Sequence, residues 1–236
     1  MQAKYKRVLI KISGEALAAE KHTGFDFDFV SRVCEAVKAC SDAGVQVGIV
    51  IGGGNFWRGV KDGAGKVERV SADRMGMLAT AMNCLAVCDV FRQLGADARI
   101  LTAMDIQGVG ERFDARKAIE YLERGSIVLF ACGSGHPFFS TDTAAVLRAA
   151  EIHADAILLA KNIDGVYDDD PRKNPAALRF DEISYDEVLA RHLAVMDTTA
   201  TSLAMDNAIP VIVFALAEPE NIGRVLEGEK LGTIVQ

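Results

Sequence analysis

The sequence predicts an α/β protein in which helices cover both faces of a mainly parallel sheet. Apolar runs typical of buried strands alternate with helical patterns over residues 7–160. Several of these runs end in loops rich in glycine, cations and hydroxyl groups, as expected where strands of an open α/β sheet end beside a ligand. The chain has 236 residues, half of them hydrophobic, which allows a large core. We therefore expect one domain, residues 1–236, with two lobes on a continuous sheet, residues 1–155 and 156–236.

Each element has its own sequence signal. The expected strands cover residues 7–12, 45–51, 98–101, 126–131, 156–160, 211–214 and 233–235. Helical patterns cover residues 28–43, 71–94, 114–124, 141–152, 184–191 and 195–207, with a helical turn at 221–227. Asp28 is the expected N-cap of the first helix, and Gly44 is placed to end it. Ser184 and Glu187 form a capping box, which predicts that a helix begins there.

Composition narrows the function classes. The chain has 26 basic and 33 acidic residues and a net charge of -7, which argues against a general nucleic-acid binder. Five cysteines form no paired framework, which favours a reducing compartment. The first residues lack the apolar region of a signal peptide, and we see no apolar run long enough to span a bilayer. We expect a cytoplasmic protein with no membrane or nucleic-acid partner.

Three strand ends carry a cation. Lys11 closes the first strand, Arg58 follows the three glycines at residues 52–54, and Lys161 ends a later strand. Consecutive glycines let backbone N–H groups approach an anion closely, and an arginine can bind phosphate through two hydrogen bonds. The alternatives are a solvated lysine at a sheet edge and a flexible glycine turn. Three glycines followed by an arginine and the only tryptophan favour a phosphate site.

Residues 131–142 form a loop that is unusually rich in aromatic and hydrogen-bonding side chains. It contains two adjacent phenylalanines, a proline, several hydroxyl residues and Asp142. A turn that only reversed the chain would not need these groups, whereas a loop that holds a base, a sugar and a phosphate would. Asp142 and Asp197 begin helical patterns. Carboxylates and cations at one sheet edge are what phosphoryl transfer requires, because the protein contributes positioning and charge neutralisation.

Other candidate motifs have simpler explanations. Gly65 and Lys66 are followed by Val67, which lacks the hydroxyl group of a Walker A loop. The glycines at 108 and 110 lack the third glycine of a dinucleotide fingerprint, since Phe113 stands there. Cys84 and Cys88 share a helix face, and core packing is the better explanation than metal binding. Asp73 on its own would be a helix cap, and the acidic run at 168–170 a surface turn.

Six segments in order strongly resemble one family. They are residues 11–17 (KISGEAL), 51–59 (IGGGNFWRG), 73–80 (DRMGMLAT), 133–142 (GSGHPFFSTD), 164–167 (DGVY) and 228–233 (GEKLGT). The first segment is typical of the amino-acid kinase superfamily, and the third and fourth are typical of its bacterial UMP kinase branch. The match spans nearly the whole chain.

The resemblance implies a three-layer α/β/α sandwich, a homohexamer, and phosphorylation of UMP to UDP by ATP with Mg²⁺. It implies catalytic roles for Lys11, Asp142 and Asp197, with Asp142 or Asp197 organising the lysines and the metal. The ATP-binding residues it implies are Lys11, Ile12, Ser13, Gly14, Gly54, Arg58, Lys161, Asn162, Tyr167 and Asp170. The UMP-binding residues it implies are Gly53, Arg58, Asp73, Ser134, Gly135, His136, Pro137, Phe138, Phe139, Ser140 and Thr141. Residues 1–155 would form the acceptor side and residues 156–236 the ATP side.

The sequence departs from the family pattern at two places. The loop before the first helix has Gly24-Phe25-Asp26 where the family usually has Gly-Phe-Gly, and Phe56-Trp57 replaces a commoner aromatic pair. GTP activation and UTP inhibition are known in the family and carry over as expectations only. Either Lys161 or Asn162 would contact ATP, because that segment varies in length across the family.

Two other functions fit the same fold. One is a kinase that forms an acyl phosphate on an amino acid or carbamate. The two phenylalanines of the 131–142 loop and Asp73 argue against it, because a small acceptor needs no pocket for a base. The other is a non-catalytic nucleotide-binding oligomer, against which the intact Lys11, Asp142 and Asp197 argue. A dinucleotide oxidoreductase is the weakest alternative.

Overall fold

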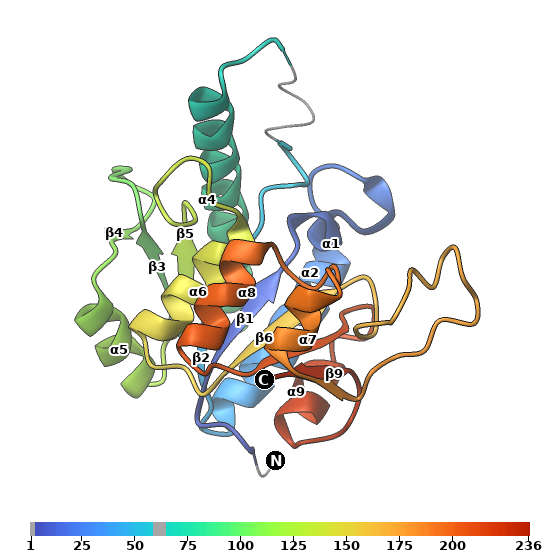
Figure 1. Cartoon of the computed structure of the whole chain (residues 1–236). Coiled ribbons are helices and arrows are strands. Elements are labelled where there is room, and N and C mark those ends of the chain that lie inside the picture. The colour runs from blue at the N-terminus through green and yellow to red at the C-terminus, as the bar shows by residue number, and fades with distance from the viewer. Residues whose placement is uncertain (1–2, 59–64) are drawn as a thin grey trace.

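The computed structural model describes residues 3–58 and 65–236. In these residues nine strands form one sheet in the order β4-β3-β5-β2-β1-β6-β8-β9-β7 (Figure 1). The strands are β1 (Arg7–Ile12), β2 (Gln46–Ile51), β3 (Ala98–Thr102), β4 (Glu111–Arg112), β5 (Ile127–Ala131), β6 (Ala156–Lys161), β7 (Glu182–Ile183), β8 (Val211–Ala215) and β9 (Thr233–Val235). Only the β8–β9 pair is antiparallel among these strands. The prediction of a mainly parallel sheet is confirmed.

Helices cover both faces of the sheet. The described helices are α1 (Gly14–Ala18), the 3₁₀ helix η1 (Ala19–Lys21), α2 (Phe27–Asp42), α4 (Arg69–Gln93), α5 (Ala115–Glu123), α6 (Thr141–Glu151), α7 (Tyr185–Ala190), α8 (Thr198–Asp206) and α9 (Asn221–Leu226). Helices α6 and α8 lie in front of the sheet in Figure 1. They belong to one apolar cluster with α5 and α7, whereas α2, α4 and α9 belong to the other. The predicted three-layer α/β/α sandwich is therefore confirmed.

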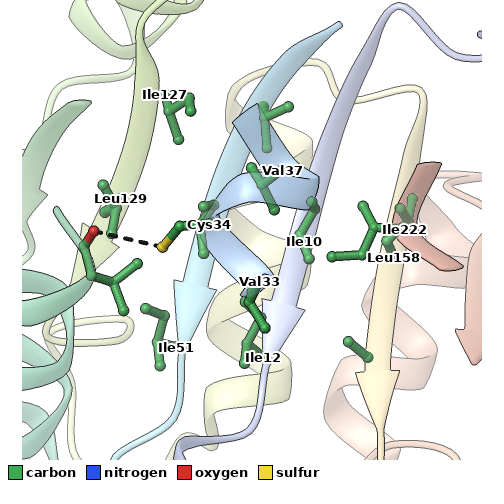
Figure 2. Close-up of a cluster of buried hydrophobic side chains, with 14 of the residues drawn as sticks. Ile10, Ile12, Val33, Cys34, Val37, Ile51, Ile127, Leu129, Leu158 and Ile222 are labelled. Atoms are coloured by element: carbon green, nitrogen blue, oxygen red, sulfur yellow. Dashed lines mark hydrogen bonds between the residues drawn. The ribbon is translucent and has the colours of Figure 1, made fainter. Parts of the chain in front are cut away.

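The period of the strands divides the core between the two layers. In β1, Ile10 and Ile12 join the cluster with α2, whereas Leu9 joins the cluster with α6, because successive side chains of a strand point to opposite faces. Figure 2 shows Ile10 and Ile12 packed with Val33 and Val37 of α2. The five cysteines are free and buried. Burial raises the pKa of the Cys40 thiol to about 11. Cys84 and Cys88 belong to the core cluster that α4 joins, which confirms their predicted core packing.

The first long helix begins earlier than expected. The prediction that Asp28 is its N-cap is wrong, because the cap is Asp26, whose carboxylate accepts hydrogen bonds from the backbone N–H of Asp28 and Phe29. Asp28 instead lies in the first turn, where a negative charge is favourable near the helix N-terminus. The predicted cap Ser184 is confirmed for α7, and Asp197, predicted at a helix start, is the N-cap of α8. The two-residue strands β4 and β7 and the short helix α1 carry no period that the sequence reveals.

Helix α4 differs from the expectation that no apolar run is long enough to span a bilayer. It has 25 residues and is the one helix in the described chain that is long and apolar enough, by length and composition, to cross a bilayer. Of its most apolar window, 56% is buried inside the protein, against β3, β5 and α2. Helix α4 is therefore a core helix.

Candidate active site

The loops singled out in the sequence meet at one edge of the sheet. Strands β5, β2, β1 and β6 are consecutive neighbours, and all run parallel. Their carboxyl ends therefore lie side by side, and they lead into the predicted phosphate, acceptor and lysine segments. Ligands of open α/β sheets bind at such an edge.

Two clefts open at this edge. The first, here the glycine cleft, has a volume of about 210 Å³ and is lined by Gly53, Gly54, Trp57, Arg58, Ala72, Asp73, Gly76, Met77, Thr80, Gly133, Ser134, Phe139, Ser140 and Thr141. The second, here the lysine cleft, has a volume of about 610 Å³ and is lined by Lys11, Ser13, Asp142, residues 161–163 and 165–172, residues 191–195 and Val213.

The start of α6 separates the two clefts. Thr141 lines the glycine cleft, and the next residue, Asp142, lines the lysine cleft. The Asp142 carboxylate forms an ion pair with Lys11, whose Nζ lies 2.7 Å from Oδ1. Both side chains are largely buried, with 12% and 18% of their surface exposed. A buried pair is screened little by water, so its charges act strongly on any group bound between the clefts.

Lys161 brings a second ammonium group to the lysine cleft. Its Nζ donates a hydrogen bond to the backbone carbonyl of Val195. Burial lowers the pKa of Lys161, the Asp142 carboxylate opposes that shift, and the positive charge of Lys11 adds to it. Two lysines thus share one carboxylate, an arrangement that leaves positive charge for a phosphate.

Asp197 lies apart from these groups. Its carboxylate caps α8 by accepting from the N–H of Ala200 at 3.0 Å. It also accepts hydrogen bonds from the hydroxyl groups of Ser140 and Thr143, and Ser140 is the N-cap of α6. Asp197 lines neither cleft. In the described structure Asp197 therefore joins the N-termini of α6 and α8. Its link to the Lys11–Asp142 pair is indirect and runs through the first turn of α6.

Glycine allows the loops after β1 and β2 to touch. A Cβ atom at Gly14 would lie 2.3 Å from the carbonyl oxygen of Gly52, much closer than non-bonded atoms approach. A Cβ atom at Gly53 would lie 2.8 Å from the carbonyl oxygen of Gly76 in α4. The backbone therefore forms the floor of the glycine cleft, as an anion site built from N–H groups requires.

Arg58 and Asp73 both line the glycine cleft. The guanidinium of Arg58 forms an ion pair with Glu15 of α1, with 2.9 Å between Nη2 and Oε1. The carboxylate of Asp73 accepts a hydrogen bond of 2.7 Å from the N–H of Phe138 and is paired with Arg69. Asp73 thus fixes the aromatic loop and is no helix cap, since α4 begins four residues earlier.

The aromatic loop, residues 134–141, exposes the rings of its two phenylalanines. Phe138 has a positive φ of 72° and is 65% exposed, and Phe139 is 51% exposed. The Arg69 guanidinium lies 5.2 Å from the centre of the Phe138 ring. Large apolar side chains with this exposure are typical of a surface that closes on a ligand.

Comparisons with known proteins identify the family. A model of the Amino acid kinase family matches residues 6–215. The chain is 52% identical over 235 residues to a uridylate kinase of Streptococcus thermophilus, which covers 99% of this chain and 96% of that protein. The chain belongs to the amino acid kinase family. The match confirms the branch that the sequence motifs predict.

Solved structures of family members have the same fold. The UMP kinase from Bacillus anthracis superposes with a TM-score of 0.95 at 37% identity and covers 98% of this chain and 96% of that chain. The UMP kinase from Ureaplasma parvum gives a TM-score of 0.93 at 36% identity, with 99% of both chains covered. The similarity thus extends over both clefts.

The predicted site residues of this amino acid kinase divide between the clefts. Lys11, Ser13, Lys161, Asn162, Tyr167 and Asp170, predicted for ATP, line the lysine cleft. Gly53, Arg58, Asp73, Ser134, Phe139, Ser140 and Thr141, predicted for UMP, line the glycine cleft. Gly54 and Arg58, also predicted for ATP, line only the glycine cleft. Ile12, Gly14, Gly135, His136, Pro137 and Phe138 line neither, and the Ile12 side chain is buried in the core.

Several residues of the clefts were not predicted from the sequence. Thr80 lines the glycine cleft, and its hydroxyl oxygen accepts a 2.8 Å hydrogen bond from the N–H of Cys132 after β5. Residues 191–195 form one wall of the lysine cleft. Thr80 is the last residue of the motif at residues 73–80, so the motif could have identified it. Residues 191–195 belong to no motif. In the described residues no group of three His, Cys, Asp or Glu side chains forms a metal site.

Proposed function

We propose that the chain transfers the γ-phosphoryl group of ATP to UMP, giving ADP and UDP. One observation carries this proposal: Thr141 and Asp142, adjacent at the start of α6, line different clefts. A donor in one cleft and an acceptor in the other would meet at the Lys11–Asp142 pair. The relatives named uridylate kinase and UMP kinase support the reaction and its acceptor.

The lysine cleft is proposed as the ATP site. Its larger volume of about 610 Å³ suits a nucleoside triphosphate, and Lys11 and Lys161 both line it. Lys11 neutralises charge that shifts between the phosphates during transfer. Asp142 holds that ammonium in place through the 2.7 Å ion pair. Fixed charges that need no reorganisation are the main source of catalysis in phosphoryl transfer. Tyr167 and Asp170 also line the cleft and are proposed to contact the nucleoside.

The glycine cleft is proposed as the UMP site. The glycine loop and Arg58 bind the acceptor phosphate, and Asp73 accepts hydrogen bonds from the ribose. The aromatic loop of residues 134–141 encloses the nucleoside. The contact between Asp73 and the N–H of Phe138 supports this arrangement, because it ties the proposed ribose ligand to the wall of the base pocket.

Mg²⁺ is the proposed metal, carried by the donor phosphates. The described residues offer no three-ligand cluster, and Asp142 is the carboxylate in the lysine cleft nearest the two ammonium groups. One carboxylate combined with phosphate oxygens is a common set of ligands for Mg²⁺. Asp142 would hold the ion, directly or through water, and the ion would neutralise phosphate charge.

The assembly and its regulation extend the proposal. The predicted homohexamer is supported by four exposed apolar side chains of α4, Met75, Leu78, Met82 and Leu85, whose spacing places them on one face. GTP activation, UTP inhibition and a cytoplasmic location stay predictions. Sizing of the purified protein with and without GTP tests the assembly, and a monomer at micromolar concentration would contradict it.

One assay tests the reaction. The purified protein is incubated with ATP and Mg²⁺ and with UMP, CMP, dTMP, glutamate, aspartate or carbamate as acceptor, and ADP formation is followed. We expect turnover with UMP far above that with every other acceptor. Absence of phosphoryl transfer to UMP would refute the proposal, and transfer to an amino acid or carbamate would support the acyl-phosphate alternative.

A further inference from the structure

Two buried asparagines lie beneath the glycine cleft. Asn55 follows β2 and is 2% exposed, and Asn83 lies in the middle of α4 and is fully buried. Neither residue lines a cleft, and neither belongs to the motifs' predicted ligands. Burial of two uncharged polar side chains is costly unless every polar atom has a partner.

The two amides satisfy each other. Asn55 Nδ2 donates to Asn83 Oδ1 at 2.9 Å, and Asn83 Nδ2 donates to Asn55 Oδ1 at 2.8 Å. Each amide uses its other N–H on a backbone carbonyl. Asn83 donates to Gly52 at 2.6 Å, and Asn55 donates to Gly24 at 2.9 Å. All four N–H groups therefore have acceptors, and a fully satisfied buried network of this kind fixes one geometry.

The carbonyl of Gly52 makes this pair relevant to the cleft. Gly52 immediately precedes Gly53 and Gly54, which line the glycine cleft. The same carbonyl lies against Gly14, where a Cβ atom would come within 2.3 Å of it. A Cβ atom at Gly14 would also lie 2.7 Å from Asn55 Oδ1. The pair therefore holds the place where the loops after β1 and β2 meet.

The pair also ties a third loop to this place. The backbone carbonyl of Asn55 accepts hydrogen bonds from the Thr23 hydroxyl group at 3.0 Å and from the N–H of Gly24 at 3.3 Å. These bonds join the segment before α2 to the glycine loop. The segments after β1 and β2, the segment before α2, and α4 thus meet around these two residues.

We propose that Asn55 and Asn83 are positioning residues that hold the glycine loop in the geometry that binds the acceptor phosphate. The inference rests on the proposed function, because it assigns the glycine cleft to UMP. Neither side chain contacts the substrate. Asn83 fixes the carbonyl of Gly52, so that the N–H groups after it point into the cleft, and Asn55 holds Asn83 in register.

The test compares Asn83→Ala with the milder Asn55→Ala, which leaves Asn83 near the Gly52 carbonyl. For Asn83→Ala we expect the UMP KM to rise about tenfold, which corresponds to about 1.4 kcal/mol, and the ATP KM to change by less than about twofold. Asn55→Ala should raise the UMP KM by a smaller factor. The double variant should resemble Asn83→Ala, because residues of one network are not additive.

A matched control separates positioning from general stability. Ser126→Ala removes a partly buried hydrogen bond, the one that the buried Ser126 donates to Asp97 at the opposite end of β5. It should lower Tm and leave both KM values unchanged. If Asn83→Ala and Asn55→Ala lower Tm but keep the wild-type UMP KM, or raise both KM values in parallel, the inference is wrong.

Calorimetric binding of UMP distinguishes this inference from the proposed function. Failure of the wild-type protein to phosphorylate UMP would refute the proposed function, and the UMP affinity of the variants would still test the role of the pair. We expect weaker UMP binding by both variants than by Ser126→Ala. Equal affinities in all three variants, or no UMP binding by the wild-type protein, would overturn the inference.

Discussion

The two clefts are built in different ways. The glycine cleft is small, and its floor is backbone held from below by buried side chains of α4, namely Asn83 and Thr80. The lysine cleft is almost three times larger, at about 610 Å³ against about 210 Å³. The irregular segment between β6 and β7, which includes the acidic run at 168–170, lines the lysine cleft. In the proposed function, recognition of the acceptor therefore depends on a fixed floor, whereas the donor lies between side chains of a longer loop.

The largest expected effect is at the boundary of the clefts. Lys11→Ala should lower kcat by about 100-fold or more, because loss of one preorganised charge can cost on the order of 3 kcal/mol of barrier. The UMP KM should change little, since Lys11 lines the other cleft. Initial rates at saturating ATP and UMP measure this. Lys38→Ala, which removes an ammonium paired with the exposed Asp42, is the control. Normal turnover by Lys11→Ala would refute its role in charge neutralisation.

A smaller effect is expected at Asp73. Asp73→Asn keeps an acceptor for the N–H of Phe138 and loses the charge that attracts Arg69 and the ribose hydroxyl groups. We expect the UMP KM to rise about tenfold, in line with loss of a charge-assisted hydrogen bond, and the ATP KM to stay constant. Asp89→Asn on the same helix, which changes an exposed contact to Gln93, serves as the control. An unchanged UMP KM would leave Asp73 with a structural role only.

Two threonines allow a direct comparison of the clefts. Thr80 accepts a hydrogen bond from the N–H of Cys132 beside the glycine cleft, and Thr233 accepts one of 2.8 Å from the N–H of Val166 beside the lysine cleft. Thr80→Val should raise the UMP KM and Thr233→Val the ATP KM, each about fivefold, because each change leaves a buried N–H without its acceptor. Each variant is the control for the other. If both variants raise the same KM, the two clefts are not held independently.

The smallest expected effect is the contribution of Lys161 to the pH dependence of the protein's stability. Burial lowers its pKa in the folded state, so the folded protein binds the proton less well than the unfolded chain. The free energy of unfolding should therefore rise as pH increases from the folded pKa towards the unfolded value near 10.5, and fall as pH decreases through the folded pKa. Denaturation of wild type and Lys161→Met between about pH 8 and 10.5 isolates this effect. A stability difference that is independent of pH would contradict the lowered pKa.

Sequence patterns predicted the fold well and the contacts beneath the site poorly. Strand β1 matches its predicted bounds because a run rich in strand-favouring residues reveals a strand. The cap of α2 was misplaced because Asp26 and Asp28 are both good caps, and the choice depends on backbone geometry at Asp26.

The pairing of Asn55 with Asn83 could not be predicted, because it joins residues 28 positions apart and depends on how α4 packs. The role of Asp197 shows the converse limit. Its place at a helix start was correctly predicted, yet the sequence does not reveal that Ser140 and Thr143 donate to its carboxylate. Motifs therefore identify which loops form the site, and packing decides which of their side chains face it.

The close contact between Gly14 and Gly52 has a consequence for how this enzyme can change. Because the backbones of the two loops touch, no side chain stands between them whose size could be adjusted by substitution. Even alanine at position 14 would place a carbon 2.3 Å from the Gly52 carbonyl oxygen and would force the strand ends apart. In the proposed function, the spacing between donor and acceptor is thus a property of the sheet itself. A redesign for a longer or shorter acceptor would have to alter the walls of the glycine cleft and leave this junction intact.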